Sequence, residues 1–146
     1  MNAKIKRPRK KTLSILIAVS SLAKKRFIHN AIAKKYTKNI NIQYEQYPGD
    51  AISAMSGLIV SYDLCFVELS SNYNAYQIIL NVLKFQKQMK KKTKFIVLSE
   101  NGNKEVVKKV AKLGVKSYLL YPVEQEKIIN SLDLAFNVES CPIECE

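Results

Sequence analysis

Residues 62–70 read Tyr-Asp-Leu-Cys-Phe-Val-Glu-Leu-Ser, and this stretch decides the fold class. Its apolar run, residues 64–67, contains a β-branched and an aromatic residue, which indicates a strand buried on both faces. Because a charge is costly inside such a strand, Glu68 is expected at the C-terminal tip. In an open parallel sheet, ligands bind in the crevice beyond the strand ends. Glu68 therefore marks the candidate site.

Four further stretches have the length and composition of strands, at residues 13–19, 40–45, 95–98 and 117–121. Helical patterns separate them. The first helical pattern ends at about residue 36, and the second follows the turn at 48–50. The third covers 75–89, the fourth lies between the cap at 101–103 and Gly114, and the fifth extends from 124 to about 137. Five strands alternating with five helices predict an α/β fold. We expect a three-layer sandwich with a five-stranded parallel sheet in the flavodoxin-like order 2-1-3-4-5.

The helical patterns also predict which side chains face the core. In the first helix, capped by Ser20 and Ser21, apolar residues should point inward and lysines outward. The inward set is Phe27, Ile28, Ala31 and Ile32, and the outward set is Lys24, Lys25, Lys34, Lys35 and Lys38. For the helix at 75–89 the expected inward residues are Tyr76, Ile79, Leu80 and Leu83.

The positive charge is unevenly distributed along the 146 residues. The formal net charge is +12, and residues 1–44 hold twelve Lys and Arg without an acidic residue. A second basic block, residues 84–116, has eleven lysines against Glu100 and Glu105. We predict a basic disordered arm at residues 1–12, one domain at 13–137 and an acidic tail at 138–146.

The first 23 residues have features of a secretory signal peptide, namely a basic start, an apolar run and small residues before a cleavage point. Cleavage after Ala23 would remove a strand that the sheet needs, so a retained N-terminus in a cytoplasmic protein is favoured. The odd cysteine count, with Cys65 in an apolar strand, agrees with reduced thiols. Cys141 and Cys145 lack a second ligand pair, so no metal is expected there.

The sequence lacks the residues that nucleotide-binding proteins and Ser/His/Asp hydrolases need. The four glycines are scattered, and no glycine-rich phosphate loop follows a strand, which disfavours nucleotide binding. The one histidine, His29, lies on the basic first helix, so no Ser/His/Asp constellation is available. We expect His29 at the surface, no enzyme activity and no cofactor.

Four stretches resemble the CheY-like receiver domain of bacterial two-component response regulators. They are YDLCFVELS at 62–70, KFIVLSE at 94–100, KLGVKSYLLYPV at 112–123 and PGDAISAM at 48–55. The resemblance spans residues 13–136 and implies a CheY-like fold with a role in signal transduction or phosphorelay. Function has to be argued from the site itself, because one fold hosts many activities.

The resemblance implies a phosphorylation site whose metal-binding residues are absent. Receivers carry an acidic pair that binds Mg²⁺ after the first strand, and the matching positions are Val19 and Ser20. Their phosphoacceptor aspartate is matched by Glu68, which is one methylene longer. Phosphoryl transfer needs a cation to neutralise the developing charge, and Mg²⁺ needs oxygen ligands. We therefore expect no metal and no phosphorylation by the family mechanism, which makes this a degenerate pseudo-receiver.

The resemblance also implies switch positions near the site. Ser99 matches the Ser or Thr that contacts the phosphoryl group, and Tyr118 matches the aromatic residue that changes rotamer. Tyr121 stands where receivers have a lysine, so the positive charge of that lysine is absent. Glu68 then has two interpretations. It is a fixed charge that imitates a phosphoaspartate, or a carboxylate of structural importance, solvated or hydrogen-bonded to Ser99 or Tyr121. The structural interpretation is favoured, because little remains to sense the charge.

The leading hypothesis is an interaction module that acts by binding a protein. In receivers the signalling surface is commonly the fourth helix, the fifth strand and the fifth helix. The candidate contacts here are Val107, Lys108, Lys112 and Tyr118, with the side of Glu124. The lysines favour an acidic partner through an attraction that weakens in salt.

Two other hypotheses remain open. One is a non-specific binder of nucleic acid or an anionic surface, which would use the arm and the first helix. The arm residues concerned are Lys6, Arg7, Arg9, Lys10 and Lys11. Aromatic residues are hardly interleaved with these charges, so sequence-specific recognition is not expected. The other is a working phosphoacceptor receiver with unusual residues.

Overall fold

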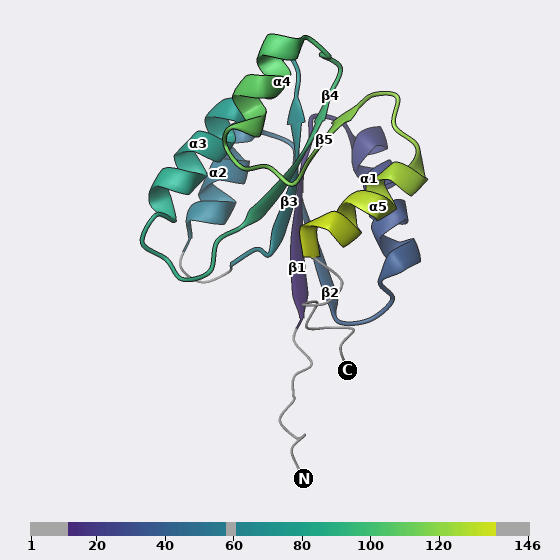
Figure 1. Ribbon diagram of the computed structural model, residues 1–146. Coiled ribbons are helices and arrows are strands. Elements are labelled where there is room, and N and C mark those ends of the chain that lie inside the picture. Colours follow the sequence, from purple (N-terminus) through teal and green to yellow (C-terminus); the bar gives the residue numbers. More distant parts are fainter. Residues whose placement is uncertain (1–11, 58–60, 137–146) are drawn as a thin grey trace.

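The computed structural model describes residues 12–57 and 61–136, where five strands and five helices alternate (Figure 1). The predicted acidic tail and all of the predicted arm except Thr12 lie outside these residues. Within them, no helix is long and apolar enough to cross a membrane.

The five strands form one parallel sheet in the order β2-β1-β3-β4-β5. Their bounds are β1 (Leu13–Ala18), β2 (Ile40–Glu45), β3 (Leu64–Leu69), β4 (Lys94–Ser99) and β5 (Ser117–Leu120). The predicted fold class and strand order are confirmed. The central strands β1 and β3 are buried almost throughout, because helices cover both faces of the sheet.

The helices divide between the two faces of the sheet (Figure 1). On one face lie α1 (Leu22–Lys35) and α5 (Gln125–Phe136), and on the other lie α2 (Pro48–Ser56), α3 (Ala75–Phe85) and α4 (Lys104–Ala111). Successive side chains of a strand alternate between the faces. Accordingly, Ile15 and Ile17 of β1 enter the core under α1 and α5, whereas Leu16 and Ala18 enter the other core.

Helix α3 differs from its predicted length and orientation. It ends at Phe85, and its buried residues are Ala75, Ile78, Ile79 and Val82, so only Ile79 of the predicted inward set is fully buried. The helix stops early because Gln86 turns into the core. Its side chain accepts the Thr93 N–H at 2.9 Å and donates to Thr93 Oγ1 at 3.1 Å. These bonds tie the end of α3 to the start of β4.

Candidate functional site at the carboxyl end of β3

Glu68 is buried near the carboxyl end of the central strand. It is the next-to-last residue of β3 and is paired with Leu98 of β4 in the sheet register. Only 1% of Glu68 is exposed, so it is not the solvated strand-tip carboxylate that was one of the expectations. A buried carboxylate is tolerated only when hydrogen bonds or an opposite charge compensate its lost hydration.

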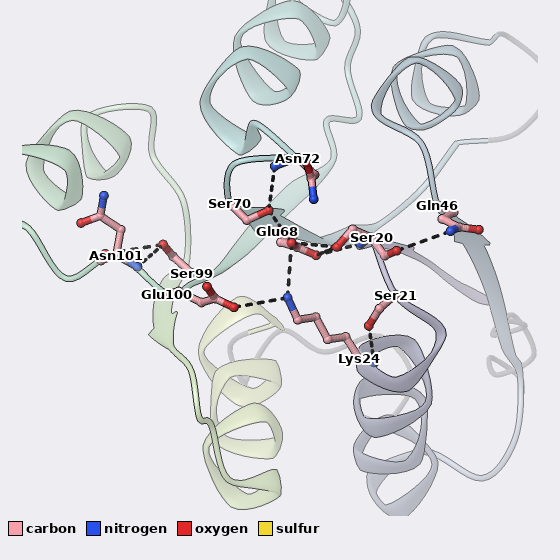
Figure 2. A network of polar contacts seen from close by, with 10 residues as sticks. All are labelled: Ser20, Ser21, Lys24, Gln46, Glu68, Ser70, Asn72, Ser99, Glu100 and Asn101. Carbon is pink, nitrogen blue, oxygen red and sulfur yellow. Dashed lines mark hydrogen bonds and ion pairs between the residues drawn. The ribbon is translucent and has the colours of Figure 1, made fainter.

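Both carboxylate oxygens of Glu68 are engaged by groups of this chain (Figure 2). The Ser20 N–H donates to Oε1 at 2.7 Å, and Ser20 Oγ lies 2.9 Å from Oε1 and 3.0 Å from Oε2. Ser70 Oγ donates to Oε2 at 2.5 Å. The partners are therefore Ser20 and Ser70, not the Ser99 or Tyr121 that the sequence suggested.

Ser20 and Ser21 have different tasks, although the sequence predicted both as helix caps. Ser21 is the N-cap of α1, and its hydroxyl accepts the Lys24 N–H at 3.1 Å. Ser20 precedes the cap and directs its N–H and its hydroxyl at Glu68. The first turn of α1 consequently lies beside the carboxylate (Figure 2), where the positive end of a helix dipole stabilises a negative charge.

Lys24 supplies a positive charge that the sequence placed in solvent. Its Nζ lies 3.3 Å from Glu68 Oε2 and 3.7 Å from Glu100 Oε2. The prediction that Lys24 points outward is wrong, because a flexible lysine stem can lie along apolar surface while its ammonium group reaches a partner. The position of Lys24 in the sequence could have indicated this contact, because Lys24 lies in the first turn of the helix that follows β1, and β1 pairs with β3.

The charge state of Glu68 follows from these contacts. Burial by itself would raise the pKa of the Glu68 carboxyl, but the hydrogen bonds from Ser20 and Ser70 and the Lys24 charge outweigh it. The pKa therefore lies below its usual value, and Glu68 is a carboxylate at neutral pH. Burial, followed by the Glu68 charge, raises the pKa of the Tyr121 hydroxyl, so Tyr121 stays neutral.

A tight turn after β3 positions the Ser70 hydroxyl. The Ser70 N–H donates to the Tyr73 carbonyl at 2.7 Å, and the Tyr73 N–H donates back at 3.3 Å. Tyr73 is buried, and its hydroxyl donates to the Glu45 carbonyl at 3.0 Å. Tyr73, which lies between the predicted strand stretch at 62–70 and the predicted helix at 75–89, was not among the residues predicted to matter for the site. A large aromatic residue within a short polar loop was the signal.

The two switch-equivalent residues meet at Asn101 rather than at Glu68. The Asn101 N–H donates to Ser99 Oγ at 2.8 Å, and the Tyr118 hydroxyl donates to the Asn101 carbonyl at 2.7 Å. Figure 2 shows Ser99 bonded to Asn101. Tyr118 thus ties β5 to the loop between β4 and α4. Tyr121 follows the end of β5 instead of lying inside it.

The residues at the receiver metal positions do not fit Mg²⁺. Val19 is fully buried in the apolar core, and the Ser20 hydroxyl is already bonded to Glu68. Among residues 12–57 and 61–136, no group of three His, Cys, Asp or Glu side chains could hold a metal ion. Mg²⁺ requires near-octahedral oxygen ligands, whereas here the Lys24 ammonium group lies against the carboxylate. The geometry disagrees with a magnesium site.

The predicted interaction surface includes a shallow hollow. Its volume is about 320 Å³, and it is lined by Tyr118, Leu119, Leu120, Pro122, Glu124 and Lys127. Leu120 is 48% exposed. Lys108 on α4 and Lys112, directly after this helix, are exposed, and Val107 is partly exposed. Leu120 was not among the contact residues predicted from the sequence.

The basic face predicted for nucleic acid is partly used inside the protein. Lys24 is paired with Glu68, and Lys35 Nζ lies 2.6 Å from Asp133 Oδ1. Lys25 Nζ is 5.9 Å from the centre of the Tyr44 ring. The arm residues from Lys6 to Lys11 lie outside the described residues.

No protein-family model and no curated protein matches the sequence. Solved structures do match. A response regulator from Thermotoga maritima has a TM-score of 0.71 at 18% identity, with 86% of this chain and 98% of that chain covered. A two-component response regulator from Clostridium difficile has a TM-score of 0.71 at 15% identity, with coverage of 86% and 97%.

A third similar structure is the CheX–CheY–BeF3–Mg²⁺ complex from Borrelia burgdorferi. The TM-score is 0.73 at 16% identity, with 86% of this chain and 90% of that chain covered. Identities this low establish the architecture and not the activity. With the strand order and helix arrangement described above, they show that this chain has the CheY-like receiver fold of response regulators.

Proposed function

We propose that this chain is a receiver-like signalling module that is not phosphorylated and acts by binding another protein. The observation that carries the proposal is the burial and hydrogen bonding of Glu68. This residue is 1% exposed, and Ser20 and Ser70 donate hydrogen bonds to its two carboxylate oxygens. A phosphodonor would have to displace these donors. It would also lack a divalent cation to neutralise the transferred group. The module is cytoplasmic and has no enzyme activity under this proposal.

The docking surface proposed for the partner is formed by α4, β5 and α5. Among the similar structures, the CheY of Borrelia burgdorferi is in complex with CheX, which supports a protein as the ligand. In this chain the exposed Leu120 offers apolar contact, and the Tyr118 bond to Asn101 holds β5 against the loop that leads into α4. The exposed Lys108 and Lys112 favour an acidic partner.

A Leu120→Asp substitution is expected to abolish capture of the partner. The new carboxylate would remove the apolar contact in the hollow and would repel an acidic protein. Wild type and variant are immobilised and exposed to an extract of the source cells, and retained proteins are identified by mass spectrometry. Retention by wild type should also weaken as the salt concentration rises.

Leu22→Asp is the matched control for this experiment. Leu22 is also 48% exposed, but it lies at the start of α1 and does not line the hollow. Leu22→Asp should therefore retain the same proteins as wild type. If Leu120→Asp retains them as well, the partner does not bind at this surface and the proposed mode of action is wrong.

A further inference from the structure

The site contains a buried negative charge but lacks the metal-binding acidic pair and the lysine that neutralise such a charge in receivers. Glu68 is a carboxylate, and Glu100 lies close enough to share a cation with it. The positions matching the metal-binding pair are Val19 and Ser20, and Tyr121 stands in place of the lysine. An uncompensated carboxylate at this depth would cost several kcal/mol. The hydrogen bonds from Ser20 and Ser70 offset part of this cost, and a cation from the chain itself would offset more of it.

Lys24 is in the right place to be that cation. Its Nζ lies 3.3 Å from Glu68 Oε2 and 3.7 Å from Glu100 Oε2, so one ammonium group bridges two carboxylates (Figure 2). The two contacts differ in strength. Glu68 is almost fully buried, whereas the Glu100 side chain is 66% exposed and is screened by water. The Glu68 contact dominates.

Tyr121 explains how the lysine is held in position. The Lys24 Nζ lies 4.7 Å from the centre of the Tyr121 ring, within the range of a cation–π interaction. The Tyr121 hydroxyl is buried, and it has no hydrogen-bond partner among the residues that the structure describes. The ring and not the hydroxyl is therefore the part of Tyr121 that serves the site.

We infer that Lys24, supported by the Tyr121 ring, is the resident cation of this site. It performs from α1 the charge neutralisation that a bound metal ion and a strand-end lysine perform in receivers. The negative charge of Glu68 is then compensated permanently, and α1 is tied to β3 without a metal ion. Lys24 is a positioning residue and takes no part in a reaction. The inference rests on the receiver-like site of the proposed function.

A charge-relocation cycle tests this inference by thermal unfolding. Lys24→Met removes the charge but keeps an apolar stem on the ring, and Tyr121→Lys restores a lysine at the receiver position. In the wild-type background, Lys24→Met should lower Tm by about 5–10 °C. In the Tyr121→Lys background the same change should lower Tm by less than half as much, because the second lysine compensates Glu68. The packing that is lost with the Tyr121 ring is absent from both proteins of the Tyr121→Lys background. It therefore cancels when the effect of Lys24→Met is compared between the two backgrounds.

Three controls complete the experiment. Lys24→Arg keeps the charge, and Tyr121→Phe keeps the ring, so each should leave Tm within about 2 °C of wild type. Lys34→Ala removes an exposed lysine from the same helix and should have a similarly small effect. Equal losses in the two backgrounds, or no loss for Lys24→Met in wild type, would overturn the inference. Phosphorylation of Glu68 would refute the proposed function without changing the outcome of this cycle.

Discussion

Replacing Glu68 with alanine is expected to lower the free energy of unfolding by about 2–4 kcal/mol. The substitution leaves the Ser20 N–H and the Ser70 hydroxyl without their acceptor and the Lys24 ammonium group without its main counter-charge. The expected loss stays below the upper range for a buried ion pair because a quarter of the Lys24 side chain remains in water. Urea unfolding at neutral pH measures the difference.

Glu68→Gln is the control that separates charge from shape. Its amide keeps one acceptor oxygen at nearly the same volume, so the loss should be smaller than for alanine but still measurable. A loss below about 0.5 kcal/mol for Glu68→Ala, typical of surface positions, would show that the network contributes nothing to stability.

The contribution of Glu68 to stability is expected to depend on pH, and comparison of wild type with Glu68→Gln measures this dependence. The pKa of Glu68 is lower in the folded protein than its ordinary value of about 4.3 in an unfolded chain. The unfolded state therefore takes up the proton first as the pH falls. The stability from the charged carboxylate is fully present above about pH 5 and is lost below that, through the folded pKa. The stability difference between wild type and Glu68→Gln should shrink over this range.

Replacing Phe66 with alanine is expected to lower the free energy of unfolding by about 3–5 kcal/mol. Phe66 lies in the middle of β3, is fully inaccessible to solvent and belongs to the core under α1 and α5. Truncation would lose its burial and leave a cavity between the central strand and those helices. Since domains of this size are stable by roughly 5–15 kcal/mol, the variant should approach the limit of folding. Urea unfolding at neutral pH measures this loss as well.

Phe85→Ala is the matched control, since Phe85 ends α3 and is 42% exposed. Its expected cost is below about 1.5 kcal/mol, because much of the side chain is already in water. Equal costs for the two substitutions would mean that the packing around β3 has been misassigned.

The fold could be predicted from the sequence because each central strand is a short, continuous apolar run. The runs around Leu64 and Leu13 can be buried only in a sheet covered on both faces, and helical patterns separate every pair of strands. The details of α3 could not be predicted in the same way. Its apolar residues are too numerous to define one face, and its end is set by the tertiary bonds between Gln86 and Thr93.

The site was only partly predictable for a physical reason. Glu68 was recognised because a single charge follows an apolar run, but its partners depend on the conformation of side chains from other elements. Lys24 has four rotatable bonds, and helical periodicity places its Cα without determining where its ammonium group lies. Ser20 likewise could serve as a cap or as a donor to Glu68. The sequence predicted a missing positive charge, whereas the structure provides one from a different element.

The Lys24 contact also bears on the two interpretations of Glu68. A charge that imitates a phosphoaspartate has to be sensed by the switch residues. Here the Ser99 and Tyr118 side chains are bonded to Asn101, while the Glu68 charge is compensated by Lys24. This arrangement supports the structural interpretation of Glu68 within the proposed function.

Incubation with a small-molecule phosphodonor and Mg²⁺, followed by intact-mass measurement, tests the central claim most directly. The claim is that Glu68 is a compensated, structural carboxylate, beside which residues 12–57 and 61–136 offer no cluster of ligands for the metal ion that phosphoryl transfer needs. The predicted result is that incubation changes neither the mass of wild type nor the mass of Glu68→Ala. A stable gain of one phosphoryl group in wild type that is lost in Glu68→Ala would contradict the account.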